Sequence, residues 1–309
     1  GVSFPMNDLA LAIDVGATKV AVGLVTRNGL VISRTDISSK AGSTIELNER
    51  LTTAIREQID KATLTITGVG IGSAGPIDHF KGTINPVNIS QWVDFSLVDF
   101  VRSISDISDI HLTGDASALA YAEFCIGAGQ GAKNLLGVVV STGIGGGTVL
   151  DGKFFSGQYG NAGFIGHTIV SIDGDPCACG ARGCVEAYAS GTNMSRLAGM
   201  SNFQEVAAAA RNGNSSAIAA IDRGARVLAT ALVNAVATMD LDTIVVGGGV
   251  INAADVYWQP LQSHFDSQVK FLQFPGKVAL KRATLGKDSG LIGAGLVGFI
   301  SVDQREGVI

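Results

Sequence analysis

The chain has 309 residues, a net charge of −5 and no run of lysine and arginine, which excludes the basic surface expected of a nucleic-acid-binding protein. Hydrophobic residues make up 46% and charged residues 16%, which excludes a disordered chain and, with this length, favours two well-buried domains. No apolar run reaches the roughly 18–20 residues of a membrane helix and no secretory leader is recognised, so we expect a cytoplasmic protein without membrane contact.

Residues 9–25 predict two strands joined by a tight turn, because Gly16 allows a positive φ between two apolar runs of high β-propensity. The polar tip suits a phosphate group, which would accept hydrogen bonds from backbone N–H groups and from the Thr18 hydroxyl, next to Lys19. Asp14 would hold Mg²⁺ through water. An ordinary hairpin with a polar tip fits the same residues equally well.

Apolar residues at helical spacing predict a helix over 44–63, and a strand follows from Thr67 to Ser73. This strand leads into a glycine turn at Gly75, where bare backbone lets another molecule approach closely. Asn88 stands in an Asn-Pro-Val-Asn sequence. It either belongs to a turn or offers its amide to a polar ligand.

Asp115 stands where a strand end passes into an alanine-rich helix, between residues 111 and 123. Aspartate is a common N-cap, so a structural role fits this position. A general base at the mouth of a cleft fits it as well, and the pattern alone does not separate the two roles.

Residues 135–150 predict a second strand, glycine turn and strand, with Thr142 and Gly143 at the tip. Two such hairpins, this one and residues 9–25, would grip a nucleoside triphosphate from two lobes. The glycine spacing differs from that of a Walker-A loop, which argues against a P-loop enzyme.

Residues 242–251 predict a buried strand followed by three successive glycines, Gly247, Gly248 and Gly249. Their bare backbone suits a flat adenine ring, and a plain tight turn is the alternative. Further helices are predicted over 203–210, 217–239 and 290–300.

Three cysteines, Cys177, Cys179 and Cys184, follow His167 within eighteen positions. One imidazole and three thiolates match a closed, tetrahedral structural zinc site. Such a site leaves no position open for water, which disfavours catalytic zinc, and three free thiols are the weaker interpretation. Cys125 lies in an apolar helical segment and is interpreted as a small buried hydrophobic residue.

Taken together, these motifs resemble the ROK family of sugar kinases within the actin-like ATPase superfamily, over nearly the whole chain. The cysteine signature is the most specific of them, and no helix-turn-helix segment precedes residue 9, which favours the kinase branch over the repressor branch. The segments that carry the resemblance are Asp14–Lys19, Gly72–Pro76, Asp115 with its helix, Ser141–Gly147, Gly166–His167 and Cys177–Glu186.

The resemblance implies an α/β protein with a two-lobed ribonuclease-H-like or actin-like ATPase fold and a central cleft. Residues 1–112 and 289–309 are expected to form a small N-terminal lobe completed by the C-terminal helix. Residues 113–288 are expected to form a larger lobe with the zinc loop. A homodimer is the family expectation.

The resemblance also implies the roles of individual residues. Asp115 would take the proton from a sugar 6-hydroxyl, and Asn88, His167 and Glu186 would hydrogen-bond the sugar ring. The two hairpins and the glycines at 247–249 would bind ATP with Mg²⁺, while structural Zn²⁺ would orient His167. The remaining residues expected to line the sugar site are Gly75, Gly114 and Phe164.

Two positions depart from the family pattern: Gly114 replaces the usual Asn, and Phe164 replaces the usual Glu. Each removes a polar contact worth on the order of 1 kcal/mol, and Phe164 adds an apolar wall that suits an acetyl group. The resemblance therefore implies 6-phosphorylation of N-acetylmannosamine, with N-acetylglucosamine and glucose as alternatives. A non-catalytic sugar-binding or regulatory protein is the alternative of another class, and polyphosphate is the alternative donor.

Overall fold

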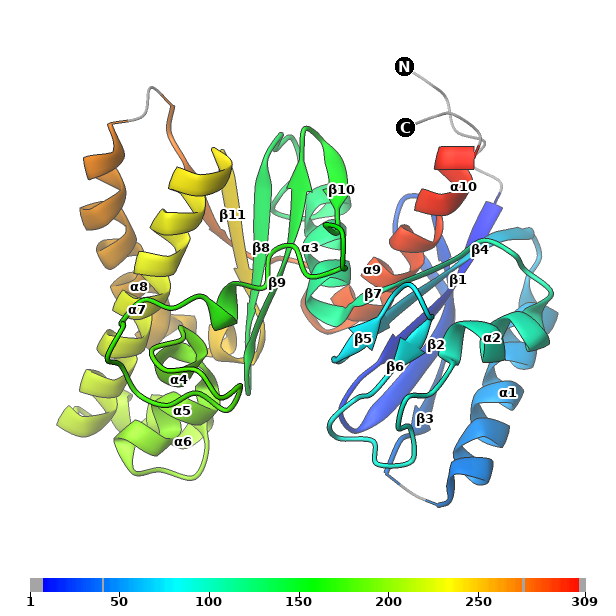
Figure 1. The fold of residues 1–309 in the computed structure, drawn as a ribbon, viewed down its shortest axis with the longest axis horizontal. Coiled ribbons are helices and arrows are strands. Elements are labelled where there is room, and N and C mark those ends of the chain that lie inside the picture. Colours follow the sequence, from blue (N-terminus) through cyan, green and yellow to red (C-terminus); the bar gives the residue numbers. More distant parts are fainter. Residues whose placement is uncertain (1–7, 41, 274–275, 306–309) are drawn as a thin grey trace. The chain divides into compact units, whose positions relative to one another are not determined.

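The structure of the chain is a computed structural model that describes residues 8–40, 42–273 and 276–305. It separates into two compact units of mixed α/β composition (Figure 1). Unit 1 contains the described residues of 1–127, 153–162 and 285–309, and unit 2 contains those of 128–152 and 163–284. Within the described ranges, no helix combines the length and apolar character needed to cross a bilayer.

Unit 1 is built on a five-stranded sheet. Its strands, in spatial order, are β3 (Val31–Ser38), β2 (Lys19–Thr26), β1 (Asp8–Val15), β4 (Thr65–Ser73) and β7 (Ile110–Gly114). β1 and β2 form the antiparallel hairpin predicted for residues 9–25, and β3 extends it. β4 runs parallel to β1, and β7 runs parallel to β4. The carboxyl ends of β1, β4 and β7 therefore lie along one edge of the sheet.

The helices of unit 1 are α1 (Thr44–Lys61), α2 (Leu97–Ser105), α3 (Asp115–Ile126), α9 (Ser289–Gly298) and α10 (Ile300–Arg305). Its short elements are β5 (Ile77–Asp78), β6 (Thr83–Ile84), β10 (Lys153–Phe155) and the 3₁₀ turn η4 (Gly286–Asp288). α1 confirms the helix predicted over 44–63. It begins with a capping box, in which Ser43 and Glu46 each accept a hydrogen bond from the other's backbone N–H.

The two faces of the unit 1 sheet pack differently. On one face, large side chains such as Leu11 and Ile13 form a core with α1 and α2. On the other face, small residues let α9 approach β1 and β4 closely. A Cβ on Gly70 would overlap the carbonyl oxygen of Ala294, so this contact requires glycine.

Unit 2 contains strands in the spatial order β9 (Ile144–Leu150), β8 (Leu135–Val140), β11 (Thr243–Gly247) and β12 (Ala279–Arg282). β8 and β9 form the antiparallel hairpin predicted for residues 135–150, with Val140 opposite Ile144. β11 runs parallel to β8, and β12 runs parallel to β11.

The helices of unit 2 are α4 (Glu186–Ala189), α5 (Gly191–Ala198), α6 (Phe203–Arg211), α7 (Ser215–Met239) and α8 (Ala254–Val269). Its 3₁₀ turns are η1 (Ile165–His167), η2 (Gly249–Ala253) and η3 (Lys270–Leu272). α7 buries the predicted stripe that includes Leu232 and Val236, and it packs along α8, which contributes Tyr257 and Phe265 to the same core.

Candidate active site and metal centre

Asp14 lies at the end of β1, immediately before the tip of the first hairpin. The tip is closed by the N–H of Gly16, which donates to the carbonyl of Lys19 at 3.0 Å, and Thr18 and Lys19 are exposed there. The Asp14 carboxylate faces the start of α9, where a Cβ on Gly290 would collide with it. Glycine therefore gives this carboxylate its space, and the positive end of the α9 dipole favours its charge.

Charges near Asp14 shift its pKa in opposite directions. Burial, and then the nearby carboxylate of Asp115, raise the pKa of Asp14 to about 6, against the opposing effects of Arg34 and Lys19. Arg34 is held in place by two carboxylates, Asp36 at 2.6 Å and Asp288 at 2.8 Å. Asp14 and Asp115 thus form an acidic pair at one edge of the unit 1 sheet, with a fixed guanidinium beside them.

Asp115 is the first residue of α3, directly after β7. The N-cap of this helix is Gly114, with no side-chain capping hydrogen bond, so the capping role for Asp115 is wrong. The Asp115 carboxylate accepts from the adjacent N–H of Ala116 at 2.7 Å and from its own backbone N–H. Desolvation by the surrounding protein raises the pKa of Asp115, although part of the residue is exposed at the surface. A carboxylate of this kind is available as a general base.

The other residues expected for the sugar in unit 1 lie near the same edge. Gly114 pairs with Ser73 across β7 and β4, and Gly75 follows at the exposed end of β4. Asn88 is exposed in the segment after β6. Exposed positions at strand ends are open to a ligand.

The second hairpin is tied to Glu186. The N–H of Ser141 donates to the carbonyl of Gly143 at 2.9 Å, which leaves Thr142 exposed at the tip. The Glu186 carboxylate accepts from the N–H of Ile144 at 2.8 Å, and a Cβ on Gly143 would lie 2.8 Å from the same oxygen. Glu186 therefore braces the hairpin with one oxygen, a role that the sequence did not indicate.

The three glycines at 247–249 have distinct surroundings. Gly248 adopts a φ of 97°, and a Cβ there would overlap the carbonyl oxygen of Val140 on β8. This packing accounts for Gly248 as a tight turn. Gly247 ends the buried strand, and Gly249 is exposed at the start of η2, so Gly249 offers the most accessible backbone of the three to a ligand.

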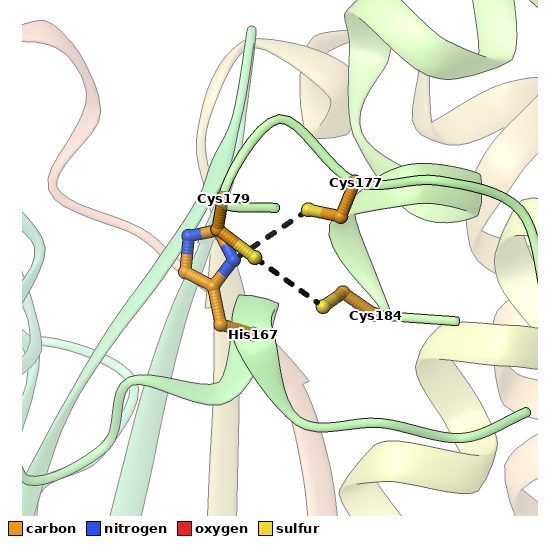
Figure 2. A group of neighbouring side chains, drawn as sticks. All are labelled: His167, Cys177, Cys179 and Cys184. Carbon is orange, nitrogen blue, oxygen red and sulfur yellow. Dashed lines mark hydrogen bonds between the residues drawn. The ribbon is translucent and has the colours of Figure 1, made fainter. Parts of the chain in front are cut away.

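The predicted metal ligands His167, Cys177, Cys179 and Cys184 converge in unit 2, as Figure 2 shows. Their four ligand atoms all lie within 4.8 Å of one another. Nδ1 of His167 is 3.7 Å from Sγ of Cys177, and Sγ of Cys179 is 3.7 Å from Sγ of Cys184. A tetrahedron with zinc–sulfur bonds of about 2.3 Å has edges of about 3.8 Å, so the donor set fits zinc.

The backbone around these ligands forms a compact knot, here called the metal loop (residues 165–186). The N–H of Cys177 donates to the carbonyl of Ala181 at 2.8 Å, and Ile169 pairs with Cys184. Phe164, just before the loop, is exposed, and its ring centroid lies 4.9 Å from that of His167. Because Nδ1 faces the sulfurs, Nε2 of His167 is the nitrogen left for another partner.

Sequence reasoning missed Arg34, Asp288 and Gly290 around Asp14. Arg34 and Asp288 are 254 positions apart, so no local pattern connects them. Gly290 resembles any small residue in an apolar helix, and only the packing of α9 against β1 reveals its place.

The sequence matches the ROK family over residues 10–297. It is 37% identical over 294 residues to an N-acetylmannosamine kinase of Yersinia pestis (strain Pestoides F), covering 93% of this chain and 97% of that protein. A ROK hexokinase from Thermus thermophilus is 31% identical, with a TM-score of 0.88 over 96% of this chain and 99% of its own. A ROK glucokinase from Streptomyces griseus, crystallised with glucose and AMPPNP, is 27% identical with a TM-score of 0.74, over 94% and 99%.

Proposed function

The chain belongs to the ROK family, and on that premise we propose that it transfers the γ-phosphoryl group of ATP to the 6-hydroxyl of a hexose or N-acetylhexosamine. Its fold is the actin-like ATPase fold of the ROK sugar kinases. The observation that carries the proposal is the Asp14–Asp115 pair at one edge of the unit 1 sheet. A sugar-binding protein without catalysis would have no use for a second, mutually repelling carboxylate there.

We propose N-acetylmannosamine as the preferred sugar. Kinship with an N-acetylmannosamine kinase over most of the chain supports this choice. The exposed ring of Phe164 beside His167 supports it as well, because an apolar wall suits an acetyl methyl group and replaces a carboxylate that would bind a hydroxyl. N-Acetylglucosamine and glucose are the alternatives within the same reaction.

In this proposal, Asp115 accepts the proton from the 6-hydroxyl as the oxygen attacks phosphorus. Burial raises its pKa, which makes it a better base than an ordinary aspartate. Asp14 binds Mg²⁺ through water, and backbone N–H groups of the hairpin tips, with Thr18 and Thr142, bind phosphate oxygens. Positioning and charge neutralisation of this kind account for most of the catalysis of phosphoryl transfer.

We propose that His167, Cys177, Cys179 and Cys184 hold a structural Zn²⁺. The ion would fix the imidazole through Nδ1, so that Nε2 is presented as a hydrogen-bonding partner for a sugar hydroxyl. Glu186 follows Cys184 by two residues, so the same loop would position the free oxygen of its carboxylate for the sugar.

The test is a coupled ADP-release assay with Mg²⁺ and ATP across N-acetylmannosamine, N-acetylglucosamine, glucose and mannose, with polyphosphate as a second donor. We expect the highest kcat/KM with N-acetylmannosamine and ATP. Asp115→Asn should lower kcat by about 10²–10⁴-fold with little change in sugar binding, because it removes a general base. Asp60→Asn, on the exposed end of α1, is the matched control.

A preference for another sugar would keep the reaction and change the substrate. Turnover that survives in Asp115→Asn would remove Asp115 from the mechanism. Sugar binding without turnover of any donor would contradict the kinase proposal and favour a binding protein.

A further inference from the structure

A cavity of about 310 Å³ lies in unit 2 and takes no part in the proposed reaction. It is formed by α7, the C-terminal part of α8, Tyr188 of α4 and the metal loop. We call it the arginine pocket. Its lining residues are Val170, Ser171, Tyr188, Arg223, Arg226, Val227, Thr230 and Gln268.

The charged groups that line the arginine pocket are all positive. Arg223 and Arg226 stand three positions apart on α7, so they share one face of the helix. Among the described residues, Arg226 has no salt bridge, and Arg223 has one, to the carboxylate of Asp175 at 3.5 Å. Arg223 also lies 4.6 Å above the ring of Tyr188, which fixes its guanidinium at the pocket wall. The pocket therefore carries a net positive charge.

The neutral polar groups of the pocket are hydrogen-bond donors. The Thr230 hydroxyl lies 3.0 Å from the amide oxygen of Gln268, so the Gln268 NH₂ group stays available as a donor. Ser171 is exposed in the metal loop and contributes a hydroxyl. Two guanidinium groups with an amide N–H and a hydroxyl are the partners that phosphate oxygens bind in proteins.

We propose that the arginine pocket binds the phosphate group of a small phosphorylated metabolite, distinct from the nucleotide of the reaction. The volume is at the lower end of the range for small-molecule sites and exceeds what a bare phosphate fills. Val170, Val227 and the Tyr188 ring supply an apolar wall for the rest of the molecule. A sugar phosphate matches this combination, and inorganic phosphate shares its anionic part.

The pocket is connected to the metal loop by short contacts. The N–H of Val170 donates to the carbonyl of Gly183 at 2.9 Å, and Gly183 precedes the ligand Cys184. The Tyr188 hydroxyl accepts from the N–H of Asp175 at 2.6 Å. A ligand that contacts Arg223 or Val170 would therefore also affect the position of the metal loop, which contains His167. This prediction rests on the proposed function: a ligand bound in the arginine pocket should change the apparent KM for the sugar more than kcat.

The binding test is isothermal titration calorimetry with inorganic phosphate and with glucose 6-phosphate, on protein saturated with ATP analogue and sugar so that the active site is filled. The variants are Arg226→Gln and Arg223→Gln. Arg196→Gln, an exposed arginine of α5 outside the pocket, is the control. We expect each pocket variant to weaken binding about tenfold or more, because each removes a charge-assisted contact, and the control to match the parent protein.

Tighter binding of glucose 6-phosphate than of inorganic phosphate would identify a phosphate ester as the ligand, and equal binding would assign inorganic phosphate. Both results support the pocket if they depend on Arg226. The proposal is overturned if neither anion binds at about 10 mM, a concentration that would detect even weak millimolar sites, or if both arginine variants bind as the parent does.

The regulatory step has a separate readout, which is the apparent KM for sugar with and without the anion. We expect a shift in the parent protein and none in Arg226→Gln, whose activity without the anion should equal that of the parent. Anion binding that leaves the apparent KM for sugar unchanged would overturn the proposed regulation. A protein without kinase activity would overturn the proposed function, while the calorimetry would still decide the pocket.

Discussion

Asp14 is a residue whose surroundings oppose its own charge. Burial and the neighbouring carboxylate of Asp115 raise its pKa to about 6, well above the ordinary value of 3.8. The proposed role nevertheless requires the ionised form, which binds Mg²⁺ through water. A folded protein that must keep such a carboxylate charged loses stability in exchange for a competent site.

We therefore expect Asp14→Asn to be more stable than the parent protein in the absence of nucleotide. A raised carboxyl pKa means that the folded state carries its full penalty above pH 6, and that the penalty disappears as the pH falls below about 4, where both states are protonated. The shift corresponds to at most about 3 kcal/mol, at 1.36 kcal/mol per pKa unit. Urea unfolding at pH 8, 5 and 4 checks the prediction, and the gain should shrink in that order.

The control for this prediction is Asp60→Asn, at an exposed position near the end of α1. It should leave the free energy of unfolding within about 0.5 kcal/mol of the parent at each pH. A gain in Asp14→Asn that is the same at all three pH values would show that the extra stability comes from something other than the charge.

At the scale of single residues, the sequence identified candidate residues better than it identified their roles. Asp115 after a strand end was compatible with an N-cap or a base, and only the position of Gly114 as the actual cap separated them. Glu186 was expected to bind sugar, but its hydrogen bond to Ile144 depends on a loop closure over 42 positions. Such contacts follow from tertiary packing, which no local pattern contains.

Among the elements, β4 and α9 pack closely enough to require glycine at the contact. Gly70 faces the α9 backbone directly, whereas its neighbours Val69 and Ile71 fill the core on the other face. The alternation of glycine with large residues follows from the twofold period of a strand. The sequence showed these glycines, but it did not show that a helix more than 200 residues later would cover them.

Gly70→Ala should destabilise the protein by more than about 3 kcal/mol, because the new methyl group would overlap a backbone oxygen that cannot turn away. The measurement is the midpoint and slope of urea unfolding. Gly276→Ala is the matched change, since a Cβ there meets no atom within 4 Å. Equal stability of the two variants would contradict the close approach of α9.

The metal loop is an element with little apolar content, in which Cys177 and Cys184 pack mainly with Ala187 and Tyr188. Cys184→Ser should abolish stoichiometric zinc binding and lower the melting temperature, because a structural metal contributes its binding energy to folding. Metal analysis by mass spectrometry and a thermal melt measure both effects.

Cys125→Ser provides the internal comparison for that experiment. Cys125 is half-buried on α3 of unit 1 and is not one of the four ligands, so this variant should keep one zinc per chain. A Cys184→Ser protein that retains full zinc would exclude the proposed ligand set. The sequence predicted this element well, because closely spaced cysteines carry their geometry in the local chain.

On the scale of the whole molecule, each unit has its own hydrophobic core. The metal ligands all belong to unit 2. Removal of the metal should therefore raise deuterium uptake in the metal loop and α4 but leave the strands β1 and β4 of unit 1 protected. Hydrogen exchange with mass spectrometry, with and without a chelator, gives this comparison segment by segment. Equal loss of protection in both units would show that they unfold as one cooperative body.

The packing of elements within each unit was harder to predict from the sequence than the elements themselves. The hairpins, α1 and the long α7 follow from local periodicity and turn residues. The arginine pocket does not, because Arg223 and Arg226 look like the ordinary solvated face of α7 until Val170 and Gln268 are placed beside them.

Unit 1 is discontinuous, and α9, which covers β1 and β4, comes from the segment after residue 285. During synthesis on the ribosome, all of unit 2 emerges before α9 does. The nascent unit 1 sheet must therefore wait with its glycine-rich face uncovered while more than 150 residues are translated. Small residues such as Gly70, Ala12 and Ala21 line this face, so it offers less apolar surface to other chains than a face of large aliphatic side chains would. We therefore expect the small residues that admit α9 so closely also to limit aggregation of the unfinished protein.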